Sequence, residues 1–412
     1  MSEDKLNVKT TLLLSFGFFA SSLAWSIYNA FVPLLLADLV ASATLIGFIM
    51  VIDNIFGLIF QPLFGRWSDK TRTRFGRRMP YIMVGIPICA LAFILIPHMN
   101  SLWSLMGVLI IFTFVMSTWR SPVVSLMPDI TPGPLRSQAN GIVNLMGGVG
   151  SLIAFGAGGL LLKVGGYPLP FLTAAIIMIG ALAVLVIFIR EPGVAYEPDA
   201  ADEKVKVKLT APERKSLILL LFAIFFWFVG YNAIETFFTL FAVNSLGVEA
   251  GNAAMMLAVF SLTFLAFAVP AGFIGAKFGR RRTIMVGLVG IIVLFIPLTM
   301  ATSVPMTIAC LAGGGIFWAC VNINSLPMVV RLAGEEKIGT YVGYYYFFSF
   351  GAQIVAPPLF GVVADLAGSY SPLFIFASLA FAAALAALVF VRHGEEEPTT
   401  TSTTEILDSL DD

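Results

Sequence analysis

Long uninterrupted apolar runs are the feature of this sequence that most restricts its fold. A helix needs about 20 mostly apolar residues to cross a bilayer, and runs of this length recur along the whole chain. They do not alternate between apolar and polar residues, as the strands of a membrane barrel do. The sequence therefore predicts twelve membrane-spanning helices, at about 10–37, 43–65, 80–98, 101–127, 139–163, 168–189, 216–242, 251–275, 284–302, 304–330, 339–365 and 371–391.

Composition argues against a soluble protein. Hydrophobic residues make up 58% of the 412 residues and charged residues only 12%, too few to cover a soluble core of this size. Acidic and basic residues number 24 each, so net charge indicates no nucleic-acid partner. The three cysteines lie inside apolar runs without metal-ligand or disulfide spacing. We therefore expect no metal site and no cofactor.

Positive charge falls almost entirely on one side of the predicted membrane. Every lysine and arginine except Arg120 and Lys163 lies at a terminus or in a connection on the same side as the termini. Because basic residues concentrate in cytoplasmic loops, we expect a multi-pass protein of the cell membrane with both termini in the cytoplasm. The first apolar run is too long for a cleaved signal peptide and is interpreted as a retained helix.

A polar stretch at 190–215 divides the chain in two. It predicts one six-helix bundle at 1–189 and another at 216–391, followed by a disordered acidic tail at 392–412. The pattern WSIYNA in the first half recurs as WFVGYNA, and RFGRR recurs as KFGRR, about 200 residues later. We infer two fused repeats, an arrangement that places the substrate at their interface near mid-membrane.

The connection between the second and third spans concentrates charge. QPLFGRWSDKTRTRFGRRMP holds one acid among basic residues, with glycines that allow close helix approach and sharp turns. Topology alone would explain the basic residues but not the acid or the thinner copy AKFGRRR in the second half. We expect charge-assisted hydrogen bonds across the two halves, forming a cytoplasmic gate from Gly65, Asp69, Arg74, Gly76, Arg77, Arg78, Asp129, Arg136, Lys277, Gly279 and Arg280.

The residues at 65–69 and 74–78 resemble the signature loop of the major facilitator superfamily. The longer pattern QPxxGxxSDxxxxRFGRRxPxI resembles the sucrose–proton symporters of plants and their animal and bacterial relatives, and a second block at 129–140 agrees. The glycoside–pentoside–hexuronide cation symporters are more distant, because they carry an acid where this chain has Gln61.

This resemblance implies an all-α membrane protein with the major facilitator fold. It also implies a secondary transporter that carries a sugar or glycoside, such as a sucrose- or maltose-like disaccharide, driven by a cation and most simply by a proton. In related proteins the acid at Asp129 serves either transport or the latch of the signature loop, and both roles stay open here.

Three ionisable residues lie inside predicted spans: Asp53, Arg120 and Glu235. A charge at the centre of a membrane helix costs about 2.5–3.5 kcal/mol on translocon-type scales, so each should have a partner or line a wet cavity. Depths of roughly 18 Å and 12 Å, at 1.5 Å per residue, allow Asp53 and Arg120 to meet. Such a pair would either lock two helices or couple proton movement to transport. Glu235 would bind sugar hydroxyls, form a second proton site, or lie at a wet outer rim.

A sugar site needs aromatic platforms and neutral amides. Most single aromatic residues in membrane helices serve packing, so the repeated Tyr-Asn pairs are the better candidates. We expect helices to be broken or bent at Pro122, Pro128, Pro327, Pro357 and Pro358. The candidate substrate-binding residues are Tyr28, Asn29, Asn54, Gln61, Trp119, Asn144, Tyr231, Asn232, Asn322 and Gln353.

Three functions remain open from the sequence. The first is proton-coupled sugar symport by alternating access, and the second is efflux of small hydrophobic molecules or metabolites. The third is a membrane-embedded enzyme or sensor, although no nucleophile–base pair, metal cluster or nucleotide loop was found. We expect a monomer without enzymatic activity whose partners are a small-molecule substrate, a proton or sodium ion, and the lipid bilayer.

Overall fold

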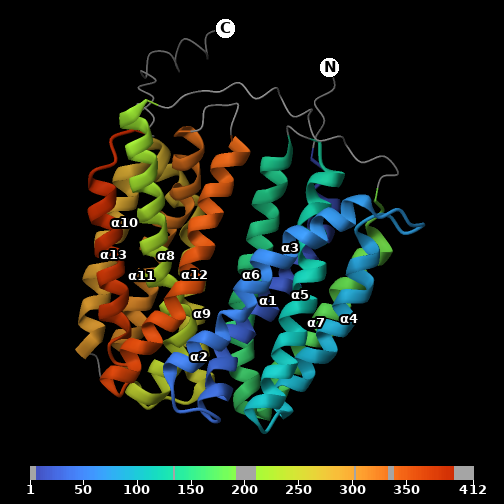
Figure 1. Ribbon diagram of the computed structural model, residues 1–412, viewed down its shortest axis with the longest axis horizontal. Helices are drawn as coiled ribbons and strands as arrows, with labels where there is room; N and C mark the ends of the chain where they lie inside the picture. Colours follow the sequence, from blue (N-terminus) through green and yellow to red (C-terminus); the bar gives the residue numbers. More distant parts are fainter. Residues whose placement is uncertain (1–5, 133–134, 192–209, 301–302, 333–337, 394–412) are drawn as a thin grey trace.

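The computed structural model describes residues 6–132, 135–191, 210–300, 303–332 and 338–393, and every regular element within these ranges is a helix (Figure 1). Two short 3-10 segments, η1 (Ile96–His98) and η3 (Ile296–Met300), follow α4 and α10. The α-helices are α1 (Val8–Ala37), α2 (Ala43–Met50), α3 (Ile52–Lys70), α4 (Met79–Leu95), α5 (Leu102–Ile130), α6 (Arg136–Gly165), α7 (Pro168–Phe188), α8 (Ala211–Leu246), α9 (Ala250–Phe278), α10 (Arg280–Phe295), α11 (Val304–Leu332), α12 (Ile338–Ala367) and α13 (Leu373–Val389).

The predicted spans are confirmed as helices. Within the described residues, 11 segments are long and apolar enough to cross a membrane, with α2 and α3 counted together, and α13 is a shorter apolar helix. Some helices begin earlier than predicted because their first turn is polar. At the start of α8, Glu213 accepts a hydrogen bond from the backbone N–H of Thr210 at 2.8 Å, which caps the helix ahead of its apolar part.

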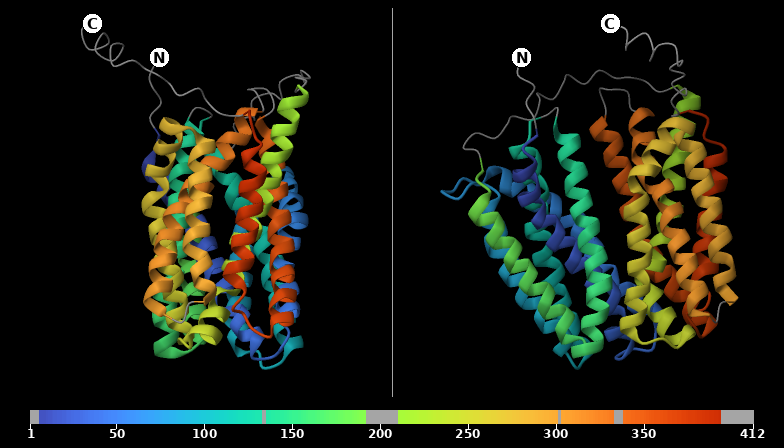
Figure 2. Two further views of the ribbon diagram at one scale, coloured as in Figure 1. Left: turned by 90° about the vertical axis from the view of Figure 1, so that its left-hand side faces the viewer. Right: turned by 180° about the vertical axis from the view of Figure 1, so that it is seen from behind.

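Helices α1–α7 and α8–α13 form two groups that stand side by side (Figures 1 and 2). The end of the molecule that carries the connection at 71–78 is called here the signature-loop face, and the other end the closed face. Most of the predicted linker at 190–215 and almost all of the predicted tail at 392–412 lie outside the described residues. The domain boundaries therefore stay predictions.

Of the breaks or bends expected at prolines, the breaks do not occur in α5, α11 and α12. Helices α5, α11 and α12 continue through Pro122, Pro327 and Pro357, because neighbouring helices in a membrane can compensate for the lost backbone hydrogen bond. The interruption lies instead at Val51, between α2 and α3, where the chain has neither proline nor glycine. It separates two parts of one predicted span. Helix α2 packs on α12 of the second group, whereas α3 packs on α5 of its own group.

Glycines bring the two groups into backbone contact at the closed face. A Cβ atom on Gly47 would lie 2.4 Å from the carbonyl oxygen of Pro357, and one on Gly361 would lie 2.5 Å from that of Ala43. Helices α6 and α9 meet in the same way through Gly159, since a Cβ there would lie 2.5 Å from the carbonyl oxygen of Gly251. Small residues let membrane helices approach this closely. Larger side chains would force the groups apart.

A carboxylate from one group caps a helix of the other at this face. Asp365, near the end of α12, accepts hydrogen bonds from the backbone N–H groups of Ala43 at 2.7 Å and Thr44 at 3.0 Å. It also accepts from the hydroxyls of Ser42 at 2.8 Å and Thr44 at 2.6 Å. Because the first N–H groups of a helix lack internal partners and attract anions, Asp365 binds the start of α2 firmly.

We predict that Asp365→Ala weakens the closed face. Losing the cap should shift the equilibrium towards separation of the groups by about 1 kcal/mol, roughly fivefold. Spin labels at the exposed positions Ala41 and Ser369 would report this by pulsed electron paramagnetic resonance as a larger population of long distances. Asp38→Ala, at an exposed acid after α1, is the matched control. An unchanged distance distribution in Asp365→Ala would show that the cap does not hold this face shut.

Candidate functional site

A side-chain hydrogen bond joins α1 of the first group to α8 of the second. The amide nitrogen of Asn29 on α1 donates to Glu235 on α8 at 3.2 Å. Both residues were predicted as functional, Asn29 as a sugar ligand and Glu235 as a proton or sugar group. Nothing in the sequence pairs them, because they are separated by 206 positions and belong to different repeats. The fold makes them a link between the halves.

Asp53 lies in the first turn of α3, directly after the interruption at Val51. Its carboxylate accepts hydrogen bonds from the backbone N–H of Asn54 at 2.6 Å and from the Asn54 side-chain amide at 2.8 Å. Arg120 and Glu235 lie near enough to Asp53 to act on it electrostatically. The predicted neighbourhood of Asp53 and Arg120 is therefore present, but no ion pair within 4.0 Å joins them in the described chain.

Arg120 on α5 is the basic group of this cluster. It is half-buried, and the groups that act on it electrostatically are Asp53 and Tyr346 of α12. Among the residues that the structure describes, none forms a hydrogen bond or ion pair with its guanidinium. Arg120 thus keeps donors that a solute could use.

A cleft of about 430 Å³ lies between the two groups next to this cluster. Its walls come from α3, α5 and α12, and Ser121 in its wall directly follows Arg120. Gln61, predicted as a substrate ligand, lines it. Its size falls within the range of small-molecule sites. The lining residues are Gly57, Leu58, Gln61, Pro62, Ser121, Gly343, Tyr346, Phe347 and Phe350.

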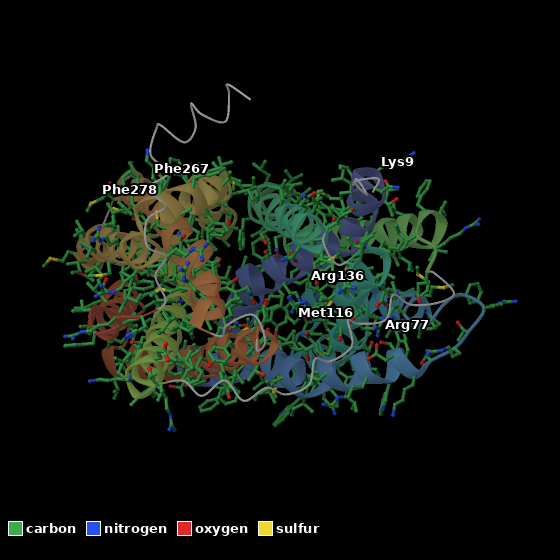
Figure 3. The ribbon with its side chains drawn as sticks, turned by 90° about the horizontal axis from the view of Figure 1, so that it is seen from above. Lys9, Arg77, Met116, Arg136, Phe267 and Phe278 are labelled. Atoms are coloured by element: carbon green, nitrogen blue, oxygen red, sulfur yellow. The ribbon has the colours of Figure 1, made fainter. Side chains whose placement is uncertain are left out.

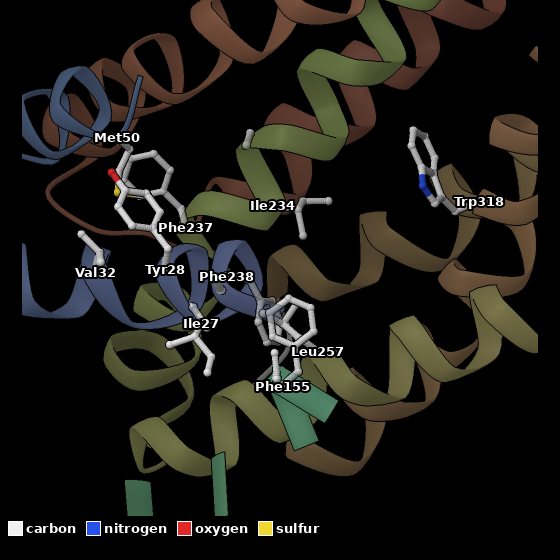
Figure 4. Packing of buried hydrophobic residues seen from close by; sticks show 14 of the residues in the cluster. Ile27, Tyr28, Val32, Met50, Phe155, Ile234, Phe237, Phe238, Leu257 and Trp318 are labelled. Carbon is white, nitrogen blue, oxygen red and sulfur yellow. The ribbon is translucent and has the colours of Figure 1, made fainter. Parts of the chain in front are cut away.

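A second cavity lies inside the second group on the other side of Glu235. It is narrow, about 30 Å³, and its walls come mainly from α8, α9, α10 and α11. Tyr231 and Trp318 stack in its wall with ring centres 4.5 Å apart and planes 5° apart. Phe155 of α6 closes it from the first group and lies next to Leu257 (Figure 4).

Several other predicted substrate ligands do not line either cavity. Tyr28 and Trp119 are fully buried packing residues: Tyr28 stacks on Phe112 at 5.6 Å, and Trp119 covers Gly85. Asn232 is buried and donates to the carbonyl of Phe228 in its own helix at 2.7 Å. The remaining three differ in exposure: Asn144 is exposed on α6, while Asn322 on α11 and Gln353 on α12 are half-buried.

The signature loop forms its ion pairs within the first group. Arg78 pairs with Asp69 and, at 3.0 Å, with Asp129, and Arg77 pairs with Asp129 at 2.5 Å. Arg78 also donates to the carbonyl of Gly65 at 3.1 Å. The expectation that these charges bridge the halves is not met in this structure, because the groups are apart at this face. Asp129 therefore belongs to the ion pairs of the signature loop, through Arg77 and Arg78.

The described contacts of Arg136, Arg74 and Lys277 lie within their own groups. Arg136 donates to the carbonyls of Thr131 and Pro128, both at 3.2 Å, and so closes the end of α5. Arg74 lies over the ring of Phe75, and Lys277 lies 5.5 Å from the ring centre of Phe278. Gly279 supplies the turn before α10, which Arg280 begins. Seen from the signature-loop face, Arg77 and Arg136 lie in one group and Phe278 in the other (Figure 3).

Sequence reasoning missed Glu191, just after α7. Its carboxylate accepts hydrogen bonds from three consecutive backbone N–H groups at the start of α4: Arg77 at 2.6 Å, Arg78 at 2.8 Å and Met79 at 2.7 Å. Gly76 turns the chain around this carboxylate with φ +104°, and a Cβ there would lie 2.5 Å from the Glu191 side chain. An acid at the start of the polar linker was the available signal.

A family model described as Major Facilitator Superfamily matches residues 14–258 and 241–410. Two solved structures share the fold. A bacterial homolog of the human lysosomal transporter Spinster, described as inward-facing and occupied, has a TM-score of 0.71 at 17% identity, covering 93% of this chain and 94% of that one. A nucleoside transporter has a TM-score of 0.73 at 13% identity, covering 93% of this chain and 100% of that one.

Curated relatives match over shorter stretches. A class H tetracycline resistance protein of Pasteurella multocida is 28% identical over 62% of this chain and 64% of its own. An uncharacterized symporter of Synechocystis is 30% identical over 32% of this chain and 26% of its own. A sucrose transport protein of Arabidopsis thaliana is 29% identical over 27% of this chain and 23% of its own. The matches thus span less than two thirds of these relatives' lengths.

Two bundles of apolar helices around a polar centre define a multi-pass membrane protein. The chain belongs to the Major Facilitator Superfamily, since its model matches nearly the whole sequence. Its described residues have the all-α fold of that superfamily.

We predict that Gly76→Ala destabilises the protein. The substitution puts a side chain at a positive φ, which costs about 1–2 kcal/mol, and pushes against Glu191. The thermal unfolding midpoint of the purified protein in detergent should fall. Gly107→Ala is the matched control, because Gly107 lies in α5 with open space around it, and there the midpoint should stay or rise. Equal midpoints for Gly76→Ala and the natural protein would contradict this account of the loop.

Proposed function

We propose that this protein couples the movement of a sugar or glycoside to that of a proton, with Asp53 and Glu235 as the proton-carrying groups and Arg120 as their basic neighbour. The observation that supports this most directly is the Asn29–Glu235 hydrogen bond between the halves, beside Asp53. Buried acids in a membrane span are costly unless they are paired, wet or protonated. Here the two acids Asp53 and Glu235 have one basic neighbour, Arg120.

The link between proton and movement follows from the hydrogen bond. An ionised carboxylate accepts a stronger hydrogen bond than a neutral acid, so the charge on Glu235 affects how tightly α8 holds Asn29 of α1. Conversely, a rocking movement that separates α1 from α8 takes the Asn29 amide away from the Glu235 carboxylate. Proton binding and rocking then influence each other, as thermodynamic linkage requires.

The sugar part of the proposal depends on the signature-loop pattern and on the stretch similar to a sucrose transport protein. Donors and acceptors near the cleft come from Asn29, Asn54, Gln61 and Arg120, and Tyr231 offers an aromatic face.

We propose that the ion pairs of the signature loop reach the other half when the signature-loop face closes. We also propose a monomer in the cell membrane with the signature-loop face in the cytoplasm.

A second candidate is efflux of small hydrophobic molecules. It is favoured by the cavity beside Glu235, whose walls are mostly apolar. The similar tetracycline resistance protein and a multidrug resistance protein of Bacillus subtilis, 26% identical over 62% of this chain, agree with it. The two candidates differ in the direction in which a proton gradient drives the solute.

We predict that Asp53→Asn abolishes uphill accumulation of sugar and retains downhill exchange, because the neutral amide cannot carry a proton. The measurement uses reconstituted vesicles, radiolabelled sucrose, maltose and monosaccharides, and an imposed proton or sodium gradient. Asp38→Asn, at an exposed acid outside the cluster, is the control. Undiminished proton-driven accumulation by Asp53→Asn would exclude Asp53 as the coupling group. Failure of the natural protein to accumulate any sugar would reject the sugar assignment.

A further inference from the structure

We infer that the hydroxyl of Tyr28 donates a hydrogen bond to the Asp53 carboxylate when the two groups rock and the signature-loop face closes. The inference rests on the proposed function, in which Asp53 carries the proton. It adds that Tyr28, which lines neither of the two cavities described above, decides in which conformation the ionised carboxylate is most stable. Tyr28 is thus a positioning residue for the proton-carrying group.

The hydroxyl of Tyr28 lacks a partner in this structure. The side chain is fully buried, and no described residue exchanges a hydrogen bond with its oxygen. Burying a hydroxyl without a partner is unfavourable, and a phenylalanine would fill nearly the same space without that cost. Such an orphaned polar group calls for an explanation, and a partner in a second conformation supplies one.

The Tyr28 ring is held in place by its neighbours. It stacks on Phe112 of α5 with ring centres 5.6 Å apart, and Trp25 lies edge-on to both rings, at 5.4 Å and 5.7 Å. These residues all belong to the first group, and the Tyr28 ring extends from α1 towards Met50, the last residue of α2 (Figure 4). Because its neighbours confine the ring, an acceptor has to move towards the hydroxyl.

Asp53 is the acceptor placed to do so. It lies just beyond the interruption at Val51, and it acts electrostatically on Tyr28. Its carboxylate has only local donors, because the backbone N–H and the side-chain amide of Asn54 both donate to Oδ1, at 2.6 Å and 2.8 Å. In the described part of the chain no residue donates to Oδ2. The carboxylate therefore keeps an acceptor for a further donor.

The interruption at Val51 explains why Asn54 holds this carboxylate here. The first N–H groups of a helix have no acceptor within that helix, and the Asn54 N–H, in the first turn of α3, uses Asp53 instead. Helix α2 packs on α12 of the second group and α3 on α5 of the first, so rocking changes the bend at Val51. A continuous helix would give the Asn54 N–H the carbonyl of Met50 as its acceptor, and would release the Asp53 carboxylate to Tyr28.

The proton takes part in this exchange of partners. A hydroxyl binds an ionised carboxylate more strongly than a neutral acid, so loss of the Asp53 proton to water in the cleft favours the conformation with the Tyr28 bond. Proton loss then draws the signature-loop face shut, and proton binding releases it. The other ionisable groups around Asp53 are Arg120 of α5 and Glu235 of α8, which in turn face Tyr346 of α12 and Tyr231 of α8.

The test measures the width of the signature-loop face in the purified full-length protein at pH 5 and pH 9. Spin labels at the exposed positions Lys9 of the first group and Phe278 of the second report it by pulsed electron paramagnetic resonance (Figure 3). In the natural protein the population of short distances should grow at pH 9. Tyr28→Phe keeps the ring and its stacking, but should lower the ratio of short to long distances about tenfold at pH 9 and leave it unchanged at pH 5.

Two controls separate the hydroxyl from packing. Tyr167→Phe removes a hydroxyl that interacts with Asp38, and should leave the ratio unchanged at both pH values. In an Asp53→Asn background, Tyr28→Phe should have little further effect, because both changes remove the same charged hydrogen bond. Each measurement is repeated with Glu235→Gln, so that the second acid does not contribute to the response to pH.

Equal ratios at pH 9 in the natural protein and Tyr28→Phe would overturn the inference, and so would an undiminished effect of Tyr28→Phe in the Asp53→Asn background. The vesicle assay judges the proposed function separately. If Asp53→Asn loses accumulation while Tyr28→Phe leaves the distances unchanged, the role of Tyr28 is rejected and the proposed function stands. If Tyr28→Phe shifts the distances as expected while Asp53→Asn accumulates sugar normally, the contact stands and Asp53 is not the coupling group.

Discussion

The structure depends on the contact of glycine backbones at the closed face. Helices α2 and α12, and α6 and α9, meet where Gly47, Gly361, Gly159 and Gly251 have no side chains to separate them. Two rigid groups held together at one end leave space at the other. The cleft, the separated loops of the signature-loop face and the closeness of Asn29 to Glu235 all follow from this geometry. A superfamily that works by rocking needs such a contact to be firm and reversible.

The two repeats have diverged in their use of charge. The signature loop of the first group forms a network around Arg78 and Asp129, whereas in its thinner copy Arg281 donates to the carbonyls of Leu388 and Val389 at the end of α13. At the closed face, Asp365 caps α2, while Lys163 of the other repeat donates to Asn252 of α9 at 2.9 Å. Similar positions in the two repeats thus carry opposite charges.

The membrane environment makes the charges of Asp53, Glu235 and Arg120 energetically important. In water a surplus carboxylate would be unremarkable, but within a bilayer it needs compensation. Asp53, Glu235 and Arg120 come from both halves, so any change in their separation changes the electrostatic balance. This is the physical reason why proton binding and a change of conformation can each affect the other.

The sequence by itself determined the series of long apolar helices, the family and the identity of the charged residues within those helices, because apolar length and charge are local properties of a chain. It did not determine the interruption at Val51, the Asn29–Glu235 bond, or the capture of three N–H groups by Glu191. It also placed Tyr28 and Trp119 among the ligands, although both pack inside the first group. Those features depend on which helix faces meet across large separations in the chain, and only the packing of the two groups decides that.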